Sequence, residues 1–222
     1  MSLIERLISV IAPFQCIDCD AEGSLLCTAC RSALPAVPSR CYRCNRSTIA
    51  YRTCSTCRRA SALLQVWVST PYDGTAKTLL HKLKFERASA AAQDIAAAMA
   101  ARMQLSGPAV VSYIPTAPSR VRMRGYDQAQ RIARELARQL GLPYAPLLTR
   151  VTSARQVGQN REVRRKQMQQ AFRPTHAARQ FKDAHVLLVD DVITTGATCE
   201  AAAAALREAG ISRVSVSVFA AA

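Results

Sequence analysis

The sequence predicts an α/β domain with a parallel sheet, preceded by a small cysteine-rich metal-binding domain. The first observation is an apolar run at residues 186–189 that ends at two aspartates and leads, through a loop, into a helical pattern at 197–209. A continuous apolar run of this length is typical of a parallel strand that is buried on both faces. The second observation is that eight of the nine cysteines form four Cys-x-x-Cys pairs near the amino terminus.

The cysteine pairs predict two zinc sites. The pairs are Cys16 with Cys19, Cys27 with Cys30, Cys41 with Cys44, and Cys54 with Cys57. Two pairs supply the four thiolates of a tetrahedral zinc site, and a site closed in this way is structural. We expect the first pair to combine with the second and the third with the fourth, although interleaved pairing would use the same eight ligands. Four disulfides are the competing interpretation, which a reducing compartment disfavours.

We expect two domains, an N-terminal helix with a double zinc ribbon (1–60) and an α/β domain (61–222). Residues 13–60 contain few large apolar side chains, and metal binding can supply on the order of 10 kcal/mol to such a module. The first twelve residues predict a short amphipathic helix rather than a signal peptide, because Glu5 and Arg6 interrupt the apolar run. No run of 18 apolar residues occurs, so we expect no transmembrane segment. We expect a cytoplasmic location, with peripheral docking at the inner membrane as the alternative.

Positive charge is concentrated in one part of the chain. The formal net charge is +15, and residues 117–179 contain 14 of the 30 basic residues but only 3 of the 15 acidic ones. An excess of this size predicts an anionic partner, such as a nucleic acid or a phosphate-rich metabolite. Lys82 and Lys84 lie outside this stretch on a predicted helix, where they suit either a bound diphosphate or the solvent.

The segment after the apolar run has the features of an anion-binding site. Asp190 and Asp191 end the run, and Thr194, Thr195, Gly196, Ala197 and Thr198 form the loop and the start of the helix. Backbone N–H groups at a helix N-terminus bind phosphate with the helix dipole behind them. Paired carboxylates repel phosphate, so they would accept hydrogen bonds from vicinal hydroxyls or hold a metal ion through water. The alternative is that these residues only cap the helix.

A second predicted strand, at residues 109–114, leads to the same edge of the sheet. The strand is followed by Pro115, Thr116, Arg120, Arg122 and Arg124, and Gly125 permits a turn into a helix predicted at 128–140. Because the carboxyl ends of parallel strands share one edge, we expect this loop to face the two aspartates. Guanidinium groups suit phosphate oxygens, so the loop is a candidate diphosphate site.

Further basic residues predict a surface for single-stranded nucleic acid. We assign Arg124, Arg161, Arg164, Arg165 and Lys166 to this surface. Such residues bind the phosphates of a single strand. Aromatic side chains for base stacking are scarce in this part of the chain, so sequence-specific reading of bases is not expected.

The strand, the paired acids, the threonine-rich loop and the helix together resemble the diphosphoribosyl-binding signature of type I phosphoribosyltransferases. The resemblance implies a parallel α/β sheet in which Asp190 and Asp191 contact ribose hydroxyls and residues 194–198 hold the 5′-phosphate. It also implies that the pyrophosphate lies at residues 114–120. Displacement of pyrophosphate would need Mg²⁺ on the departing group, but no general base is evident and the acceptor is unknown.

A wider resemblance covers nearly the whole chain. The paired cysteines, the segments at 72–74 and 80–85, the segments at 113–116 and 120–128, and the Asp-Asp loop follow one another as in the competence protein F family. The resemblance implies an accessory protein of DNA uptake that binds phosphoribosyl diphosphate and single-stranded DNA. Two alternatives stay open. One is an active phosphoribosyltransferase, and the other is an adaptor whose zinc ribbons dock on a helicase or a membrane-channel protein of DNA uptake.

Overall fold

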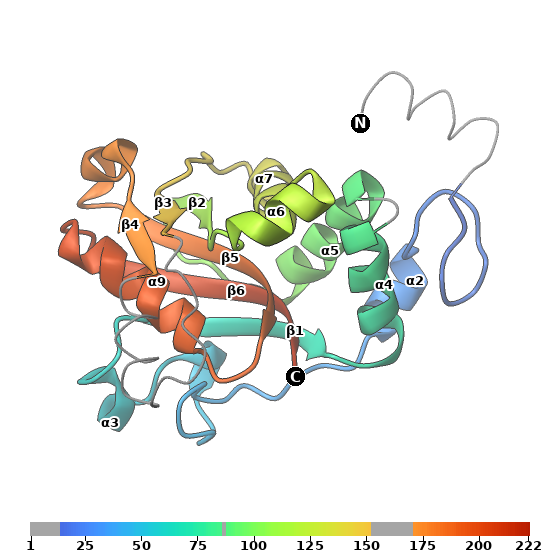
Figure 1. The fold of residues 1–222 in the computed structure, drawn as a ribbon. Coiled ribbons are helices and arrows are strands. Elements are labelled where there is room, and N and C mark those ends of the chain that lie inside the picture. Colours follow the sequence, from blue (N-terminus) through green and yellow to red (C-terminus); the bar gives the residue numbers. More distant parts are fainter. Residues whose placement is uncertain (1–13, 86–87, 152–170) are drawn as a thin grey trace, which may run out of the picture.

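A four-stranded parallel sheet, in the order β1-β6-β5-β2, forms the centre of the computed structural model, which describes residues 14–85, 88–151 and 171–222 (Figure 1). The strands are β1 (Val66–Pro71), β2 (Ala109–Tyr113), β5 (His185–Ile193) and β6 (Arg213–Ala221). The predicted parallel sheet is confirmed, and the apolar run 186–189 lies in β5 between β6 and β2.

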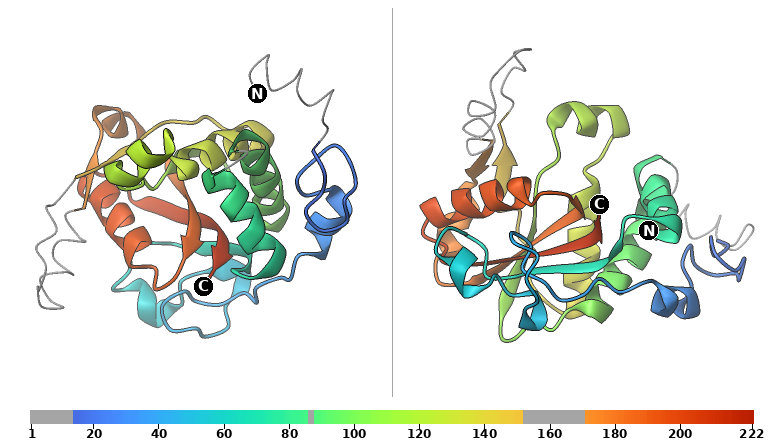
Figure 2. Two further views of the ribbon diagram at one scale, coloured as in Figure 1. Left: turned by 45° about the vertical axis from the view of Figure 1, so that its right-hand side comes forward. Right: turned by 90° about the horizontal axis from the view of Figure 1, so that it is seen from below.

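Helices cover both faces of the sheet, which explains why its strands are apolar runs. α4 (Gly74–Phe85), α5 (Ala88–Arg102) and α7 (Gln128–Leu140) pack on one face, and α9 (Ala197–Glu208) packs on the other (Figures 1 and 2). Leu187 and Val189 of β5 belong to the first core, whereas Val186 and Leu188 belong to the second. The alternation along one strand therefore supplies both cores.

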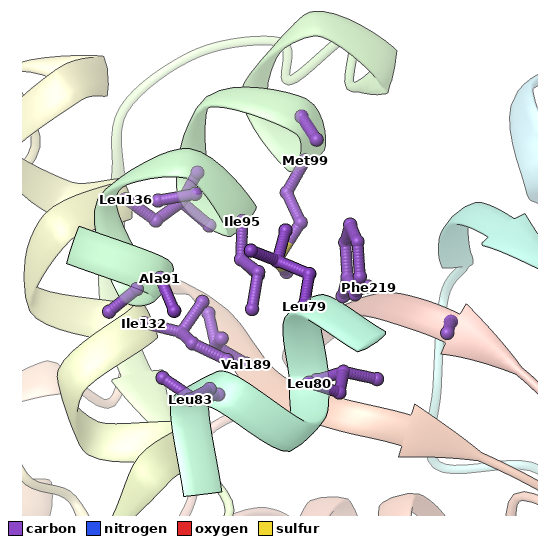
Figure 3. Close-up of a cluster of buried hydrophobic side chains, with 14 of the residues drawn as sticks. Leu79, Leu80, Leu83, Ala91, Ile95, Met99, Ile132, Leu136, Val189 and Phe219 are labelled. Carbon is purple, nitrogen blue, oxygen red and sulfur yellow. The ribbon is translucent and has the colours of Figure 1, made fainter. Parts of the chain in front are cut away.

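The core under α4, α5 and α7 fixes the position of these helices against the strands (Figure 3). Leu79, Leu83, Ile95, Ile132 and Val189 meet there, and each is 0% exposed. Burying one such side chain stabilises the fold by about 1.5–3 kcal/mol. α7 spans the residues predicted for it, with Asp127 as its N-cap and Gly141 as its C-cap.

β5 is longer than the apolar run that predicts it. It continues through Asp190 and Asp191 to Ile193, because β6 stays paired with it that far. β2 ends earlier, with Tyr113 opposite Val189. The two aspartates are therefore part of a strand that extends past the end of its neighbour, and they do not begin the loop.

The chain leaves β2 and β5 toward opposite faces of the sheet. After β2 it passes through α6 (Pro118–Arg124) to α7 on one face, and after β5 it turns to α9 on the other. Neighbouring parallel strands that diverge in this way leave a crevice at their carboxyl ends, which is where open α/β sheets bind ligands. β3 (Leu148–Arg150) and β4 (Phe172–Pro174) form a separate antiparallel pair.

The cysteine-containing region forms two separate ribbons (Figure 1). The first ribbon (residues 14–34) includes α2 (Thr28–Ala33) and packs on α5 through Leu25 and Leu26. The second ribbon (residues 39–59) includes η1 (Ile49–Tyr51) and α3 (Ser55–Arg58) and lies beside α9. A short 3-10 helix, η2 (His176–Phe181), precedes β5.

Two further predictions concern a helix at the amino terminus and the absence of a transmembrane segment. The amphipathic helix predicted for the first twelve residues lies outside the described residues. Within the described ranges, no helix combines the length and the hydropathy that crossing a membrane requires.

Candidate functional site

The paired acids lie at the carboxyl end of β5, where neighbouring elements hold one of them. Asp191 Oδ2 pairs with Lys84 Nζ of α4 at 3.1 Å and accepts a hydrogen bond from Gln128 Nε2 of α7 at 3.4 Å. Lys84 therefore contacts a protein carboxylate, which is neither of the two uses expected for it from the sequence.

The second acid is desolvated. Burial raises the pKa of Asp190 well above its usual value, and the neighbouring Asp191 carboxylate raises it further. The Asp190 Oδ1 atom accepts the Asp191 N–H at 2.8 Å. A carboxyl group that holds a proton can both donate and accept hydrogen bonds, so Asp190 and Asp191 together suit a pair of hydroxyl groups better than they suit an anion.

The predicted phosphate loop connects β5 to α9, and we call residues 194–198 the threonine loop. Thr194, Thr195 and Ala197 are exposed, whereas Gly196 is buried. Gly196 is the N-cap of α9 and has a φ of 74°, a conformation that glycine adopts readily and other residues rarely do. The loop therefore offers two exposed hydroxyls beside the N–H groups of a helix N-terminus.

Asp127, which the sequence reasoning missed, organises the loop after β2. Its carboxylate accepts the Thr116 N–H at 2.7 Å and the Thr116 hydroxyl at 3.0 Å, and it caps α7 through the Ala129 N–H at 3.0 Å. One side chain thus fixes both the predicted diphosphate loop and the start of α7. A local signal for it existed, because an aspartate directly before a predicted helix is a typical N-cap.

A pocket of about 800 Å³ opens beside this loop. Its lining includes Pro115, Thr116 and Arg122 from the predicted site, and also Arg131, Arg134 and Arg150. Residues 190–198 are not among the described residues that line it. The predicted site residues therefore fall into an arginine-rich group after β2 and an acid and threonine group at the end of β5.

Arg150 of β3 lines the same pocket, and the sequence did not assign it to the diphosphate site. Its Nη1 donates to the Pro115 carbonyl at 3.3 Å, and its guanidinium lies 5.3 Å from the Phe172 ring centroid. Burial lowers the pKa of Arg150, while the Asp190 carboxyl acts in the opposite direction. Arg150 is therefore within electrostatic reach of Asp190. The pairing of β3 with β4 is needed to place it, so no local pattern could have found it.

The predicted arginines of α6 take different positions. Arg120 and Arg122 are exposed, whereas Arg124 Nη1 donates to Gln128 Oε1 at 2.8 Å. Since Gln128 also contacts Asp191, Arg124 joins the network around the paired acids. The other residues assigned to nucleic acid, Arg161, Arg164, Arg165 and Lys166, lie outside the described residues.

Both cysteine clusters have the geometry of a tetrahedral zinc site. The first contains Cys16, Cys19, Cys27 and Cys30, the second contains Cys41, Cys44, Cys54 and Cys57, and the Sγ atoms of each lie within 4.8 Å of one another. The Sγ atoms of Cys19 and Cys27 are 3.7 Å apart, and those of Cys44 and Cys54 are 3.6 Å apart. Thiolates bonded tetrahedrally to zinc at about 2.3 Å are about 3.8 Å apart. The sequential grouping is confirmed, and interleaved pairing is wrong.

The free thiols also argue against disulfides. All nine cysteines are free, and a disulfide would need an Sγ–Sγ distance of about 2.0 Å. Although burial opposes it, hydrogen bonds from backbone N–H groups lower the pKa of Cys16 and of Cys41 to about 6. Each cluster therefore contains a thiol that ionises readily, as a metal ligand must.

Comparisons with known proteins find a similar domain and similar whole chains. A model of the phosphoribosyl transferase domain matches residues 126–222. The chain is 28% identical over 220 residues to competence protein F of Haemophilus influenzae, which covers 91% of this chain and 95% of that protein. It is 29% identical over 206 residues to DNA utilization protein YhgH of Salmonella typhimurium, and this match covers 86% of this chain and 88% of that protein.

Solved structures match less of the chain. The glutamine phosphoribosylpyrophosphate amidotransferase from B. subtilis, complexed with ADP and GMP, is similar with a TM-score of 0.43 and 19% identity. The match covers 62% of this chain and 30% of that one, so this chain spans less than a third of the solved protein.

Proposed function

Because the chain belongs to the competence protein F family of phosphoribosyltransferase-like proteins, we propose that it is an accessory protein of DNA uptake whose crevice binds phosphoribosyl diphosphate. The observation that supports this most is the crevice itself. Paired acids lie near the end of one strand, a threonine loop follows that strand, and an arginine-lined loop follows its neighbour. One ligand with a phosphate, a vicinal diol and a diphosphate has the chemistry to match all three parts.

Each part of the ligand has a proposed partner. The 5′-phosphate would bind the N–H groups and hydroxyls of the threonine loop, and the ribose hydroxyls would bind Asp190 and Asp191. The diphosphate would lie against Pro115 and Thr116, with Arg120, Arg122 and Arg150 as the cations. Mg²⁺ needs no protein cage in this proposal, because it keeps water and phosphate oxygens as most of its ligands.

The two cysteine clusters are proposed to hold structural zinc. Four thiolates at the spacing described above match zinc in number, type and geometry. With every coordination position taken by sulfur, the ions would supply folding energy and no chemistry. Reduced thiols also fit a cytoplasmic location, which is part of the proposal together with the division into residues 1–60 and 61–222.

Isothermal titration with phosphoribosyl diphosphate and Mg²⁺ tests the ligand. We expect binding in the wild type and a loss of about tenfold or more in affinity for Asp190→Asn combined with Asp191→Asn, since each lost hydrogen bond costs about 1 kcal/mol. Asp183→Asn is the matched control, because Asp183 is an exposed acid just before the opposite end of β5. The proposal fails if the wild type gives no saturable heat or if the double variant binds like the control.

Single-stranded DNA is the proposed macromolecular partner. The charge excess of residues 117–179 and the arginines of the pocket support it. Binding to a labelled oligonucleotide should weaken with salt, with a slope of about −0.7 per phosphate contact in a plot of log K against log salt. Reversing Arg161, Arg164 and Arg165 to glutamate should make the slope about 2 units shallower. Arg213→Glu, at the start of β6, is the control, and equal slopes in both variants would exclude this surface.

An exposed apolar residue favours the adaptor function as a second candidate. Ile49, on the second ribbon, is 86% exposed. Ile49→Asp should abolish association with a helicase or membrane-channel protein of DNA uptake if the ribbon docks there, while phosphoribosyl diphosphate affinity stays unchanged. If association survives this substitution, the second ribbon is not part of the interface.

Transferase activity is tested separately. Pyrophosphate release with a screened acceptor, lost in the double variant of Asp190 and Asp191, would show that the protein is an active phosphoribosyltransferase.

A further inference from the structure

Gly196 of the threonine loop is packed against an aromatic ring from the second ribbon. A Cβ atom built at Gly196 would lie 2.7 Å from Tyr42 Cδ2 and 3.0 Å from Tyr42 Cε2. The ring therefore occupies the space that a side chain at position 196 would need. Gly196 is buried while Thr194 and Thr195 are exposed, so the ring supports the loop and leaves its hydroxyls accessible.

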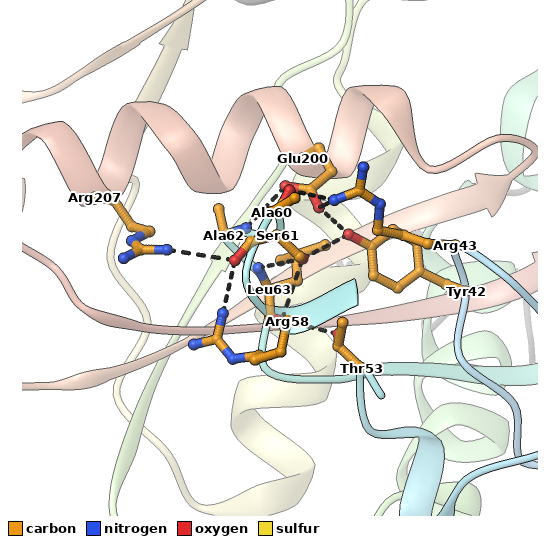
Figure 4. A network of polar contacts seen from close by, with 10 residues as sticks. All are labelled: Tyr42, Arg43, Thr53, Arg58, Ala60, Ser61, Ala62, Leu63, Glu200 and Arg207. Atoms are coloured by element: carbon orange, nitrogen blue, oxygen red, sulfur yellow. Dashed lines mark hydrogen bonds and ion pairs between the residues drawn. The ribbon is translucent and has the colours of Figure 1, made fainter. Parts of the chain in front are cut away.

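The Tyr42 hydroxyl fixes this ring to the first turn of α9 (Figure 4). It donates to Glu200 Oε1 and lies 2.7 Å from Ser61 Oγ. The other oxygen of Glu200 accepts the Ala62 N–H at 3.0 Å, and the Glu200 N–H donates to the Gly196 carbonyl at 2.9 Å. Glu200 therefore links the second ribbon and the segment before β1 to the first turn of α9.

Tyr42 belongs to a turn that two of the proposed zinc ligands enclose. Cys41 precedes it and Cys44 follows, and the turn is closed by the Asn45 N–H, which donates to the Cys41 carbonyl at 2.8 Å. A metal ion bound by both thiolates would hold the turn in this shape. The position of the ring over Gly196 would then depend on the metal.

We propose that the second ribbon positions the phosphate loop, with Tyr42 as the positioning residue, so that the second cysteine cluster and the loop are energetically coupled. The proposal rests on the proposed function, because its ligand is phosphoribosyl diphosphate. Linkage makes the coupling reciprocal: the ligand raises the affinity of the second cluster for zinc, and zinc raises the affinity of the loop for the ligand by the same factor. The first cluster, which packs on α5 instead, is outside this coupling.

Zinc competition tests the coupling in the full chain. The zinc-loaded protein is titrated to equilibrium with a zinc-selective chromophoric chelator, with and without saturating phosphoribosyl diphosphate and Mg²⁺. We expect the ligand to raise the zinc affinity of the second cluster about fivefold or more, the lower end of usual coupling energies. The zinc affinity of the first cluster should stay unchanged. Cys44→Ser removes a ligand of the second cluster, so it identifies which step of the chelator titration belongs to that cluster.

Three variants separate the contact from general effects. Tyr42→Ala should abolish the coupling, and Tyr42→Phe, which keeps the ring and loses only the hydroxyl, should retain part of it. Ile17→Ala is the matched control, because Ile17 follows Cys16 in the first ribbon as Tyr42 follows Cys41 in the second. If the wild type binds phosphoribosyl diphosphate but the zinc affinity of its second cluster is the same with and without that ligand, the proposal is overturned.

Hydrogen exchange of the ligand-free protein provides a second arm. Tyr42→Ala should raise exchange at residues 194–200 by about tenfold, as a loss of about 1.4 kcal/mol of local stability would, and Ile17→Ala should not. Unchanged exchange in Tyr42→Ala would overturn the positioning role. Raised exchange in a protein that binds no phosphoribosyl diphosphate would support the positioning role and reject the proposed function, so the two failures are distinguishable.

Discussion

Asp127 shows how a single carboxylate can serve a helix and a binding loop at once. One of its oxygens accepts the Ala129 N–H at the start of α7, and the other accepts the Thr116 N–H after β2. Asp127→Asn keeps the oxygen that caps α7 and accepts the Thr116 hydroxyl, but it replaces the other oxygen with a donor, so the bond from the Thr116 N–H is lost. We expect little change in thermal stability and weaker pyrophosphate binding by calorimetry.

Asp127→Ala should lose both contacts. Removing an N-cap costs about 1 kcal/mol, so urea unfolding should show that loss for alanine and not for asparagine. If the alanine variant binds pyrophosphate as tightly as the wild type, Asp127 does not organise the diphosphate loop.

Asp190 makes stability depend on pH. Burial raises its pKa in the folded protein, so the folded state holds a proton that the unfolded state releases. The stability linked to Asp190 is fully present below the unfolded pKa and is lost as the pH rises through the raised folded pKa. Asp190→Asn should therefore flatten the fall in unfolding free energy across this range, measured by urea unfolding at a series of pH values. Parallel curves for the two proteins would contradict the burial of this carboxyl.

At the scale of elements, α5 anchors the first ribbon. Asp94 is 8% exposed and accepts the Leu26 N–H at 2.9 Å, and Arg102 Nη2 donates to the Leu34 carbonyl at 2.8 Å. Asp94→Ala leaves a buried N–H without this acceptor, which costs about 1–3 kcal/mol. We expect faster zinc loss to a chelator from the first cluster and an unchanged rate from the second. Asp94→Asn keeps an acceptor and should lie close to the wild type.

Elements with a strong local pattern could be predicted from the sequence, and contacts between distant elements could not. The apolar run of β5, the amphipathic pattern of α7 and the cysteine spacing each carry their own signal. The apolar run stops at Val189 whereas β5 continues to Ile193, because pairing with β6 decides where the strand ends. Arg150 and the ion pair of Lys84 with Asp191 depend on tertiary packing, so no spacing rule identifies them.

At the scale of the whole molecule, the ribbons and the sheet share their cores. Leu26 of the first ribbon is 1% exposed in the same cluster as α5 and α7. Removing zinc should therefore destabilise the entire chain and not only residues 14–60. We expect calorimetry after chelation to show a single unfolding transition at lower temperature. A second transition that keeps the temperature of the zinc-loaded protein would show that the α/β domain is independent of the ribbons.

The central claim is that one phosphoribosyl ligand bridges the ends of β2 and β5. Hydrogen exchange with and without phosphoribosyl diphosphate and Mg²⁺ tests it most directly, because it reads both loops in one experiment. We predict slower exchange at residues 114–120 and at residues 194–198 together, and none of this protection in the double variant of Asp190 and Asp191. Protection of only one of these loops, or of neither, would contradict the claim.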